Sequence, residues 1–196
     1  MPVKQGTFGT SPIYNGVNKI GKIYRGIELF YTSSNPLVDL ISRQIKKATI
    51  GGNGNIEIIG DYSFSDCTKL TDLNILTGIK STGISSFDGC SSLKNVTIAN
   101  TVQTIGNLTF SGCTSLTTIT LPESVTSIGG SAFYGCTSMT TMTILATTPP
   151  TLSAVSDIPG SVTTIYVPSA SLSAYTTANT WKDLLTRDQP VTFVGI

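Results

Sequence analysis

The sequence contains no histidine, few charged residues and no long hydrophobic run, and each of these absences excludes a class of function. Without histidine, the chain cannot form a Ser-His-Asp triad, use an imidazole as a general acid or base, or build the common zinc sites. Charged residues make up 12% of the chain and the formal net charge is +1, which argues against binding to nucleic acid or to an anionic membrane. No segment approaches the roughly 18 apolar residues of a membrane-spanning helix, so we expect no membrane insertion.

We expect no secretion signal in the first residues of this sequence. Residues 1–6 contain no charged region followed by an apolar core, which an export signal requires. If the sequence is complete, we expect the protein to stay in the cytosol or to leave the cell within a larger particle.

A 23-residue repeat occupies the centre of the chain. Four sets of residues recur at this interval and in the same register: Gly60, Gly83, Gly106 and Gly129; Phe64, Phe87, Phe110 and Phe133; Cys67, Cys90, Cys113 and Cys136; Leu70, Leu93, Leu116 and Met139. Self-similarity at such a period is typical of solenoids. The alternation in Ile119-Thr120-Leu121 predicts a strand with one buried face. Each coil is expected to hold this strand, a tight helical or 3₁₀ turn and a short second strand.

These residues resemble the BspA-like leucine-rich repeat, whose pattern is V-x-x-I-G-x-x-A-F-x-x-C-x-x-L-x-x-I-x-I/L-P. The match covers residues 56–167; the fourth copy fits best, and the second has Thr82 where isoleucine is expected. The resemblance implies an α/β solenoid, a short right-handed leucine-rich-repeat array with helical caps. It also implies adhesion and contact with proteins or glycans, typically on bacterial cell surfaces.

Four segments are predicted along the chain. Residues 1–34 are expected to form an extended arm and β-hairpin, 35–50 an N-terminal cap helix, 51–168 the repeats and 169–196 a C-terminal cap. The hairpin strands are expected near 20–24 and 27–31, since Asn15-Gly16 and Arg25-Gly26 favour turns. Pro36 suits the first turn of the cap helix, and Gly51-Gly52 would end it. The C-terminal cap is expected to contain a helix over 171–185 and a strand over 191–194.

The N-terminal arm carries a hypothesis of attachment. Its segment 14–26 resembles short repeats found near the ends of bacteriophage structural proteins, which implies a head- or tail-fibre-like virion protein assembled in the host cytoplasm. The arm would bind other virion or surface proteins through apolar residues, namely Tyr14, Ile20, Ile23, Tyr24, Ile27 and Phe30. We therefore expect a homo-oligomer. A trimer is the form considered, because fibres are often trimers.

Polar residues between the buried positions of the strands form the candidate contact surface. One column contains Asp72, Asn95, Thr118, Thr141 and Thr164, and the next contains Asn74, Thr97, Thr120, Thr143 and Tyr166. Two such columns make a flat polar surface that suits a host protein or glycan. Two other interpretations stay open: the columns serve only β-propensity and solubility, or the paired threonines bind ice.

Three further groups of residues are weighed as sites. The cysteines, spread one per coil, are interpreted as core rather than metal ligands or disulfides, and no metal or cofactor is expected. Asp66 and Asp88 are a candidate glycosidase pair, but aspartate at a coil corner is typical of turns. Tyr166, Tyr175 and Trp181 would either stack on sugars or fill the C-terminal cap.

Together these features predict a non-catalytic structural or binding module. The main hypothesis is a bacteriophage virion protein that displays a leucine-rich-repeat surface to the host. The alternatives are a bacterial cell-surface adhesin of the BspA-like type and a glycan-degrading spike component.

Overall fold

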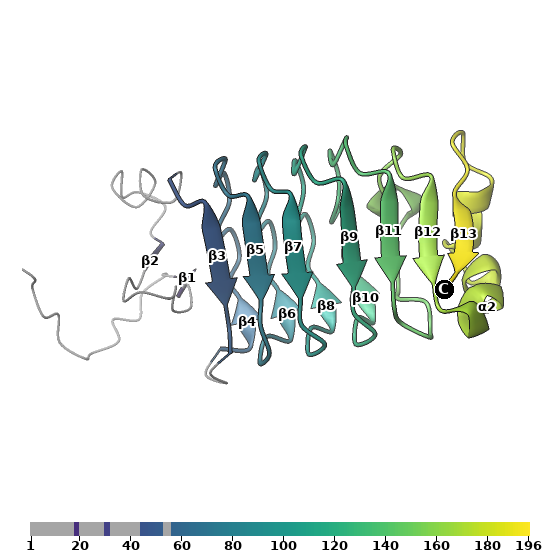
Figure 1. The fold of residues 1–196 in the computed structure, drawn as a ribbon, viewed down its shortest axis with the longest axis horizontal. Helices are drawn as coiled ribbons and strands as arrows, with labels where there is room; N and C mark the ends of the chain where they lie inside the picture. The colour runs from purple at the N-terminus through teal and green to yellow at the C-terminus, as the bar shows by residue number, and fades with distance from the viewer. Residues whose placement is uncertain (1–17, 20–29, 32–43, 53–55) are drawn as a thin grey trace, which may run out of the picture.

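The computed structural model describes residues 18–19, 30–31, 44–52 and 56–196, and they contain a parallel β-solenoid. Figure 1 shows the coils stacked side by side, with a row of long strands on one face and a row of short strands behind it. The solenoid has about five turns and few helices, so the predicted repeat architecture is confirmed. The stacking follows from the repeat, because each coil presents the same residues to its neighbours.

The long strands face the viewer in Figure 1. In chain order they are β3 (Lys47–Ile50), β5 (Asp72–Ile75), β7 (Asn95–Ile98), β9 (Thr118–Leu121), β11 (Thr141–Ile144), β12 (Thr164–Val167) and β13 (Thr192–Gly195). They form two parallel sheets, β3-β5-β7 and β9-β11-β12-β13. Inward residues of these strands alternate with outward ones, as the period of two predicts.

The short strands form a third parallel sheet, on the opposite side of the core. They are β4 (Ile58–Ile59), β6 (Ser81–Thr82), β8 (Thr104–Ile105) and β10 (Ser127–Ile128), hydrogen-bonded in that order. Tight turns connect each short strand to the next long one. These turns also bond from coil to coil, since the backbone N–H of Phe87 donates to the Thr109 carbonyl at 2.9 Å and that of Phe110 to Ala132 at 2.8 Å.

The turn segments differ from the helical or 3₁₀ turns expected from the sequence. Each repeat has two residues in the left-handed region: Tyr62 and Asp66, Ser85 and Gly89, Leu108 and Gly112, Ser131 and Gly135. A left-handed residue interrupts a right-handed helix. The chain therefore runs through consecutive tight turns, such as the one closed by the N–H of Cys67 on the carbonyl of Phe64 at 3.3 Å.

The core is a set of columns that run along the solenoid axis. Phe64, Phe87, Phe110 and Phe133 stack with ring centroids 5.2, 5.6 and 5.7 Å apart and nearly parallel rings. The four cysteines and the column ending in Met139 are also fully buried. Because neighbouring coils supply identical shapes, each ring packs on its own copy, and one column serves all four repeats.

The N-terminal boundary differs from the sequence prediction. A cap helix over 35–50 was expected, but Lys47–Ile50 form strand β3, which pairs in parallel with β5. Ala48 and Ile50 face the core and are 1% exposed. Burial of these two side chains and pairing with β5 determine the strand. The apolar residues whose spacing predicted a helix lie mostly outside the described residues.

The N-terminal hairpin is described only in part. Strands β1 (Asn18–Lys19) and β2 (Phe30–Tyr31) pair antiparallel, with Asn18 opposite Tyr31 and Lys19 opposite Phe30. The first strand therefore begins before the expected span of 20–24, while the second lies within the expected span of 27–31. Residues 20–29 are outside the described residues.

The C-terminal cap is broken into short helices and a strand. The helix expected over 171–185 is instead α2 (Leu172–Thr177) followed by the 3₁₀ helix η3 (Lys182–Leu185), with η1 (Val155–Asp157) and η2 (Ser169–Ser171) before them. The expected last strand is β13, which extends the long sheet beyond β12. Trp181 is 1% exposed between α2 and η3, so the chain bends to bury its ring.

Candidate functional site: the outward face of the long strands

The two polar columns predicted from the sequence lie in register on the outward face of the long strands. Asp72 pairs with Asn95, and Thr141 pairs with both Thr118 and Thr164. The second column follows the same ladders, with Asn74 beside Thr97 and Thr143 between Thr120 and Tyr166. All ten side chains are at least partly exposed. The spatial arrangement expected of the columns is present; their role in binding remains a prediction.

Both columns continue over two strands that the sequence analysis did not assign to them, β3, where a helix was expected, and β13, which was expected as a strand of the cap. Strand β3 adds Lys47 and Thr49 at one end, and β13 adds Thr192 and Val194 at the other. These strands are 25 residues before β5 and 28 after β12, so a search at a fixed interval of 23 does not find them. The alternation in Lys47-Ala48-Thr49-Ile50, which matches Asp72-Leu73-Asn74-Ile75, was the signal available.

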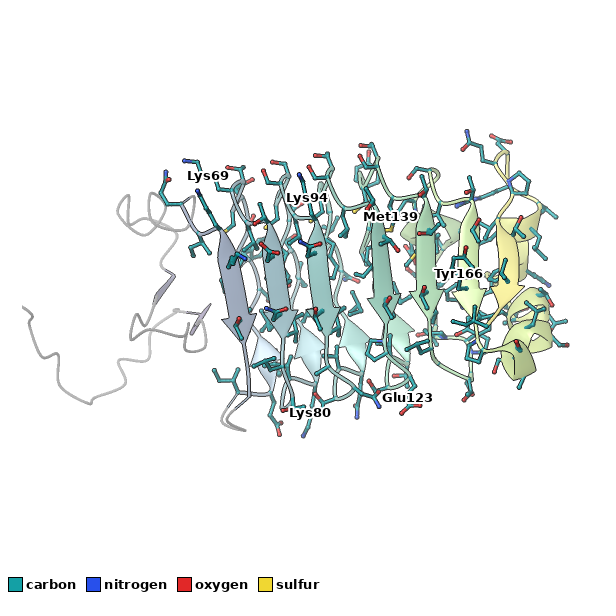
Figure 2. All side chains as sticks on the ribbon, in the orientation of Figure 1. Lys69, Lys80, Lys94, Glu123, Met139 and Tyr166 are labelled. Carbon is teal, nitrogen blue, oxygen red and sulfur yellow. The ribbon has the colours of Figure 1, made fainter. Side chains whose placement is uncertain are left out.

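The outward face is almost free of charge. In the two columns the charged side chains are Lys47 and Asp72, which lie 3.6 Å apart at the N-terminal end. The hydroxyl of Thr71, the amide of Asn95 and nearby Lys47 lower the pKa of Asp72. Figure 2 shows Lys69 and Lys94 at one end of the strands and Lys80 and Glu123 at the other, away from the middle of the face. A ligand on β7 to β13 would therefore meet neutral groups.

Hydrogen bonds along the columns hold some of these side chains in place. Asn95 donates from Nδ2 to Oδ1 of Asp72 at 2.8 Å, and Thr141 donates from Oγ1 to Oγ1 of Thr118 at 3.1 Å. Each threonine hydroxyl has one hydrogen to donate and two lone pairs. A column of such groups keeps free hydrogen-bonding capacity toward a ligand.

The long sheet is interrupted between β7 and β9. These strands are neighbours in the stack, and Figure 1 shows a wider gap between them than between other long strands, yet they are not paired. The inward residues Val96 and Ile98 of β7 are only partly buried, whereas Leu73 and Ile75 of β5 are fully buried. The coils on either side thus meet imperfectly on this face.

Proline contributes to the interruption. In neighbouring repeats the residue after the strand donates its N–H across the ladder, as Ala99 does to Ile75 and Leu145 to Leu121, both at 2.9 Å. Pro122 occupies this position after β9 and has no N–H. Proline alone only shortens a ladder: Pro168, at the same position after β12, leaves the β11–β12 pairing three residue pairs long instead of the four of β9–β11.

A second irregularity lies at the same coil interface, on the short sheet. Thr82 replaces isoleucine there, and its hydroxyl, in place of its carbonyl, accepts the N–H of Gly106 at 2.9 Å. The Thr82 hydroxyl also lies 2.9 Å from that of Thr109 inside the core. Strands β6 and β8 keep one residue pair, whereas β4–β6 and β8–β10 have two. Both ladders are therefore weakest between the same two coils.

The interruption leaves a slot in the outward face. Its volume is about 290 Å³, and it is lined by Val96, Thr97, Ile98, Thr120, Pro122 and Leu145. None of these residues is charged, and two of them belong to the second polar column. Sequence reasoning identified Thr97 and Thr120 but not the slot.

The cysteine column is part of the core, as expected. All four thiols are buried and free, and those of Cys90, Cys113 and Cys136 donate to carbonyls of Phe64, Phe87 and Phe110 at 3.1–3.4 Å. Burial raises the pKa of Cys136 to about 12 and that of Cys113 well above its ordinary value. Since the thiolate is the reactive form, these groups are protected from oxidation and alkylation in the folded protein.

We expect a reducing agent to leave the thermal midpoint unchanged, because the folded protein contains no disulfide among these cysteines. Thermal unfolding followed by circular dichroism, with and without dithiothreitol, tests this. Mass spectrometry after iodoacetamide at pH 8 should find the native thiols unmodified and all of them alkylated in guanidinium chloride. A clear fall in the midpoint on reduction would contradict this assignment.

The aromatic residues of the C-terminal cap are buried, so the cap interpretation holds for two of the three. Tyr175 donates from its hydroxyl to the Ala146 carbonyl at 2.8 Å, and Trp181 donates from Nε1 to the Pro150 carbonyl at 2.6 Å. Their rings pack edge to face with centroids 5.2 Å apart. A sugar-stacking patch that includes Tyr175 and Trp181 is therefore wrong. Tyr166, labelled in Figure 2, lies on the outward face.

The candidate glycosidase pair, Asp66 and Asp88, lies in the tight turns of adjacent coils. Asp66 has a φ of 57° where the later repeats have Gly89, Gly112 and Gly135, and its N–H donates to the Asp88 carbonyl at 2.7 Å, which fits a turn residue. Within the described ranges, no three residues among His, Cys, Asp and Glu are grouped as metal ligands would be. No helix in the described part of the chain has the length and apolar character needed to cross a membrane.

The proposed attachment residues are mostly beyond what the structure describes. Tyr14, Ile20, Ile23, Tyr24 and Ile27 lie outside the described residues, and Phe30 is described only by its backbone pairing in β2. The attachment hypothesis stays a prediction.

Comparisons with known proteins agree with the geometry. A family model described as the BspA type leucine rich repeat region matches residues 42–151 in six copies. No curated protein matches the chain. Among solved structures, a leucine rich cell surface protein from Faecalibacterium prausnitzii is 30% identical, with 58% of this chain and 27% of that chain covered and a TM-score of 0.42.

Two solved structures with TM-scores above 0.5 share the fold. The pneumococcal vaccine antigen PcpA is 18% identical, with 78% of this chain and 42% of that chain covered and a TM-score of 0.57. A leucine-rich repeat protein from Eubacterium ventriosum is 22% identical, with 72% and 37% covered and the same TM-score. The chain thus spans less than half the length of each of these three proteins.

Proposed function

Because the chain belongs to the BspA-type leucine-rich repeat family, we propose that it is a non-catalytic binding module of the adhesin type, displayed on a bacterial cell surface. Repeats of this family form binding scaffolds, and the match points to no catalytic family. The sequence analysis gave the cell-surface adhesin as an alternative, and the family match favours it over the virion hypothesis. The virion hypothesis depends on residues 14–26, which lie mostly outside the described residues, and the comparisons give it no support.

The observation that carries the proposal is the outward face of the long strands. Within each of the two sheets of long strands, the pairing holds the two columns in register, and the core columns beneath them fix their spacing. On either side of the gap between β7 and β9 the paired strands form a rigid face, and a rigid face loses little conformational entropy when a partner docks. The polar columns, from Asp72 and Asn74 to Thr164 and Tyr166, are the proposed contact residues for a protein or glycan of the host surface.

Location tests the surface proposal. Antibodies raised against the recombinant chain should label intact cells of the bacterium that encodes it, and brief protease treatment of those cells should remove the label. Recovery of the chain in purified phage particles, with no label on intact cells, would overturn the proposal in favour of the virion hypothesis.

Substitutions on the two sheets test the contact face. The variant Thr118→Arg/Thr141→Arg places two bulky cations on the outward face and should abolish binding of the labelled protein to host cells. The control Ser81→Arg/Ser127→Arg places the same groups on the short sheet and should bind as the unmodified chain does. Equal loss in both variants, or in neither, would contradict the assignment of the face.

A further inference from the structure

We propose that the slot between β7 and β9 binds one neutral sugar ring of a glycan that lies along the polar columns. The inference rests on the proposed function and names the partner class for the same face. It starts from the single interruption of an otherwise regular long sheet, placed between three long strands on one side and four on the other. The following features of the slot select its occupant.

The walls of the slot suit a group with an apolar face and a polar edge. Val96 and Ile98 are partly exposed and Leu145 is 38% exposed, while Pro122 lines the slot but is itself buried. Thr97 and Thr120 add hydroxyls at the rim. A pyranose ring presents C–H groups on its faces and hydroxyls around its edge. It can therefore contact the aliphatic residues and hydrogen-bond to the two threonines at once.

The strand edges along the slot also favour a hydroxyl-rich guest. Residues of a strand alternate in the side to which their N–H and C=O groups point. In β7, Asn95 donates to Thr71 and the following Ala99 to Ile75, on the β5 side, so the backbone groups of Val96 and Ile98 face β9. Because β7 and β9 are unpaired, a strand ladder does not use these groups. Sugar hydroxyls can bond to them, whereas an inserted aliphatic or phenyl side chain cannot.

The volume and the charge of the slot narrow the class of ligand further. A volume of about 290 Å³ is at the lower limit of ligand pockets, so the slot holds one ring, and the rest of the chain would extend over the columns. The slot residues carry no charge, which disfavours sialylated or sulfated sugars. A protein partner is less well matched, because Tyr166 is the only aromatic residue in the columns, and aromatic or arginine anchors dominate protein interfaces.

The coil interface around the slot can adjust to its guest. The long ladder is absent there, and the short ladder is reduced to one residue pair beside Thr82. The coils remain joined by the turn bonds of Phe87 and by the stacking of Phe87 on Phe110 at 5.6 Å. The slot can therefore widen about this joined side without loss of the core.

A glycan array that contains neutral and acidic oligosaccharides provides the test, with the full chain as the labelled probe. Neutral oligosaccharides should bind, and isothermal titration of those found should give a dissociation constant for each. The variant Thr97→Val/Thr120→Val removes two hydroxyls at nearly constant volume and should weaken binding about tenfold or more, as expected for two lost hydrogen bonds. The control Thr104→Val on the short sheet should stay within about twofold.

Methyl spectra of the unmodified chain give an independent readout. Titration with a bound oligosaccharide should shift the methyl resonances of Val96 and Ile98, which contact a guest only inside the slot. Absence of neutral glycan binding, a preference for acidic glycans, or binding without these shifts would overturn the inference. Cell binding that survives periodate oxidation of host glycans would also overturn it, and would leave the proposed function standing with a protein partner.

Discussion

Replacement of Phe110 by alanine is expected to lower the free energy of unfolding by about 3–5 kcal/mol, the usual cost of deleting a buried phenylalanine. Phe110 is fully buried and stacks on both Phe87 and Phe133, with ring centroids 5.6 and 5.7 Å away. Its removal leaves a cavity that the stacked coils cannot close. The spacing to the coils before and after it is held by backbone hydrogen bonds, from Phe87 to Thr109 and from Phe110 to Ala132. The loss also falls on the coil interface where both ladders are already weakest.

Urea denaturation followed by circular dichroism measures this change. Tyr134→Ala serves as the control, because Tyr134 is in the following repeat but 66% exposed, and its truncation should change stability by less than about 0.5 kcal/mol. If Phe110→Ala costs under about 1 kcal/mol, the phenylalanine column does not hold the coils together as described.

The repeating part of the fold could be predicted from sequence because each coil is supported by a copy of itself. Once Gly, Phe, Cys and Leu recur at one interval, the neighbour of every core residue is known, and so is the face on which it lies. The same reasoning placed the outward columns correctly, since residues between buried strand positions must point outward. What those columns bind does not follow from periodicity, and their role remains proposed.

The ends and the defect of the solenoid could not be predicted in the same way. At Lys47–Ile50, pairing with β5 decides the structure, and that partner is 25 residues away in place of the usual 23. In the C-terminal cap, burial of Trp181 breaks an apparently continuous helix. Both outcomes depend on contacts made by single residues that the repeat pattern does not contain.

The slot, for which we propose a binding role, illustrates the same limit. Proline after the strand is part of the family pattern, and Pro168 shortens a ladder by one residue pair without opening it fully. Only at Pro122 does the missing N–H coincide with Thr82 on the other side of the same interface. Neither Pro122 nor Thr82 predicts an interrupted sheet on its own. That both lie at the interface of the same two coils follows only from the three-dimensional stacking.

Gly129→Ala is expected to cost about 3 kcal/mol, at the upper end of the cost of overpacking. Gly129 belongs to the glycine column with which the 23-residue repeat was defined, and it lies against the preceding coil. A methyl group there would be 2.5 Å from the backbone nitrogen of Asn107 and 2.6 Å from the carbonyl carbon of Gly106. Both neighbours are backbone atoms, so the coils must separate and strain the 2.8 Å bond from the Gly129 N–H to Ile105.

The adjacent Gly130 supplies a matched control for this prediction. A methyl group at Gly130 would meet Ser153 Oγ at 3.5 Å and Asn107 Oδ1 at 3.7 Å, which are ordinary contacts, and its φ lies outside the left-handed region. Gly130→Ala should therefore be neutral or raise stability by about 0.4–1 kcal/mol, since alanine restricts the unfolded chain. Urea denaturation of both variants compares the same chemical change one residue apart. Equal effects would mean that the glycine column reflects backbone flexibility, whereas a loss confined to Gly129→Ala would show that it sets how closely the coils approach.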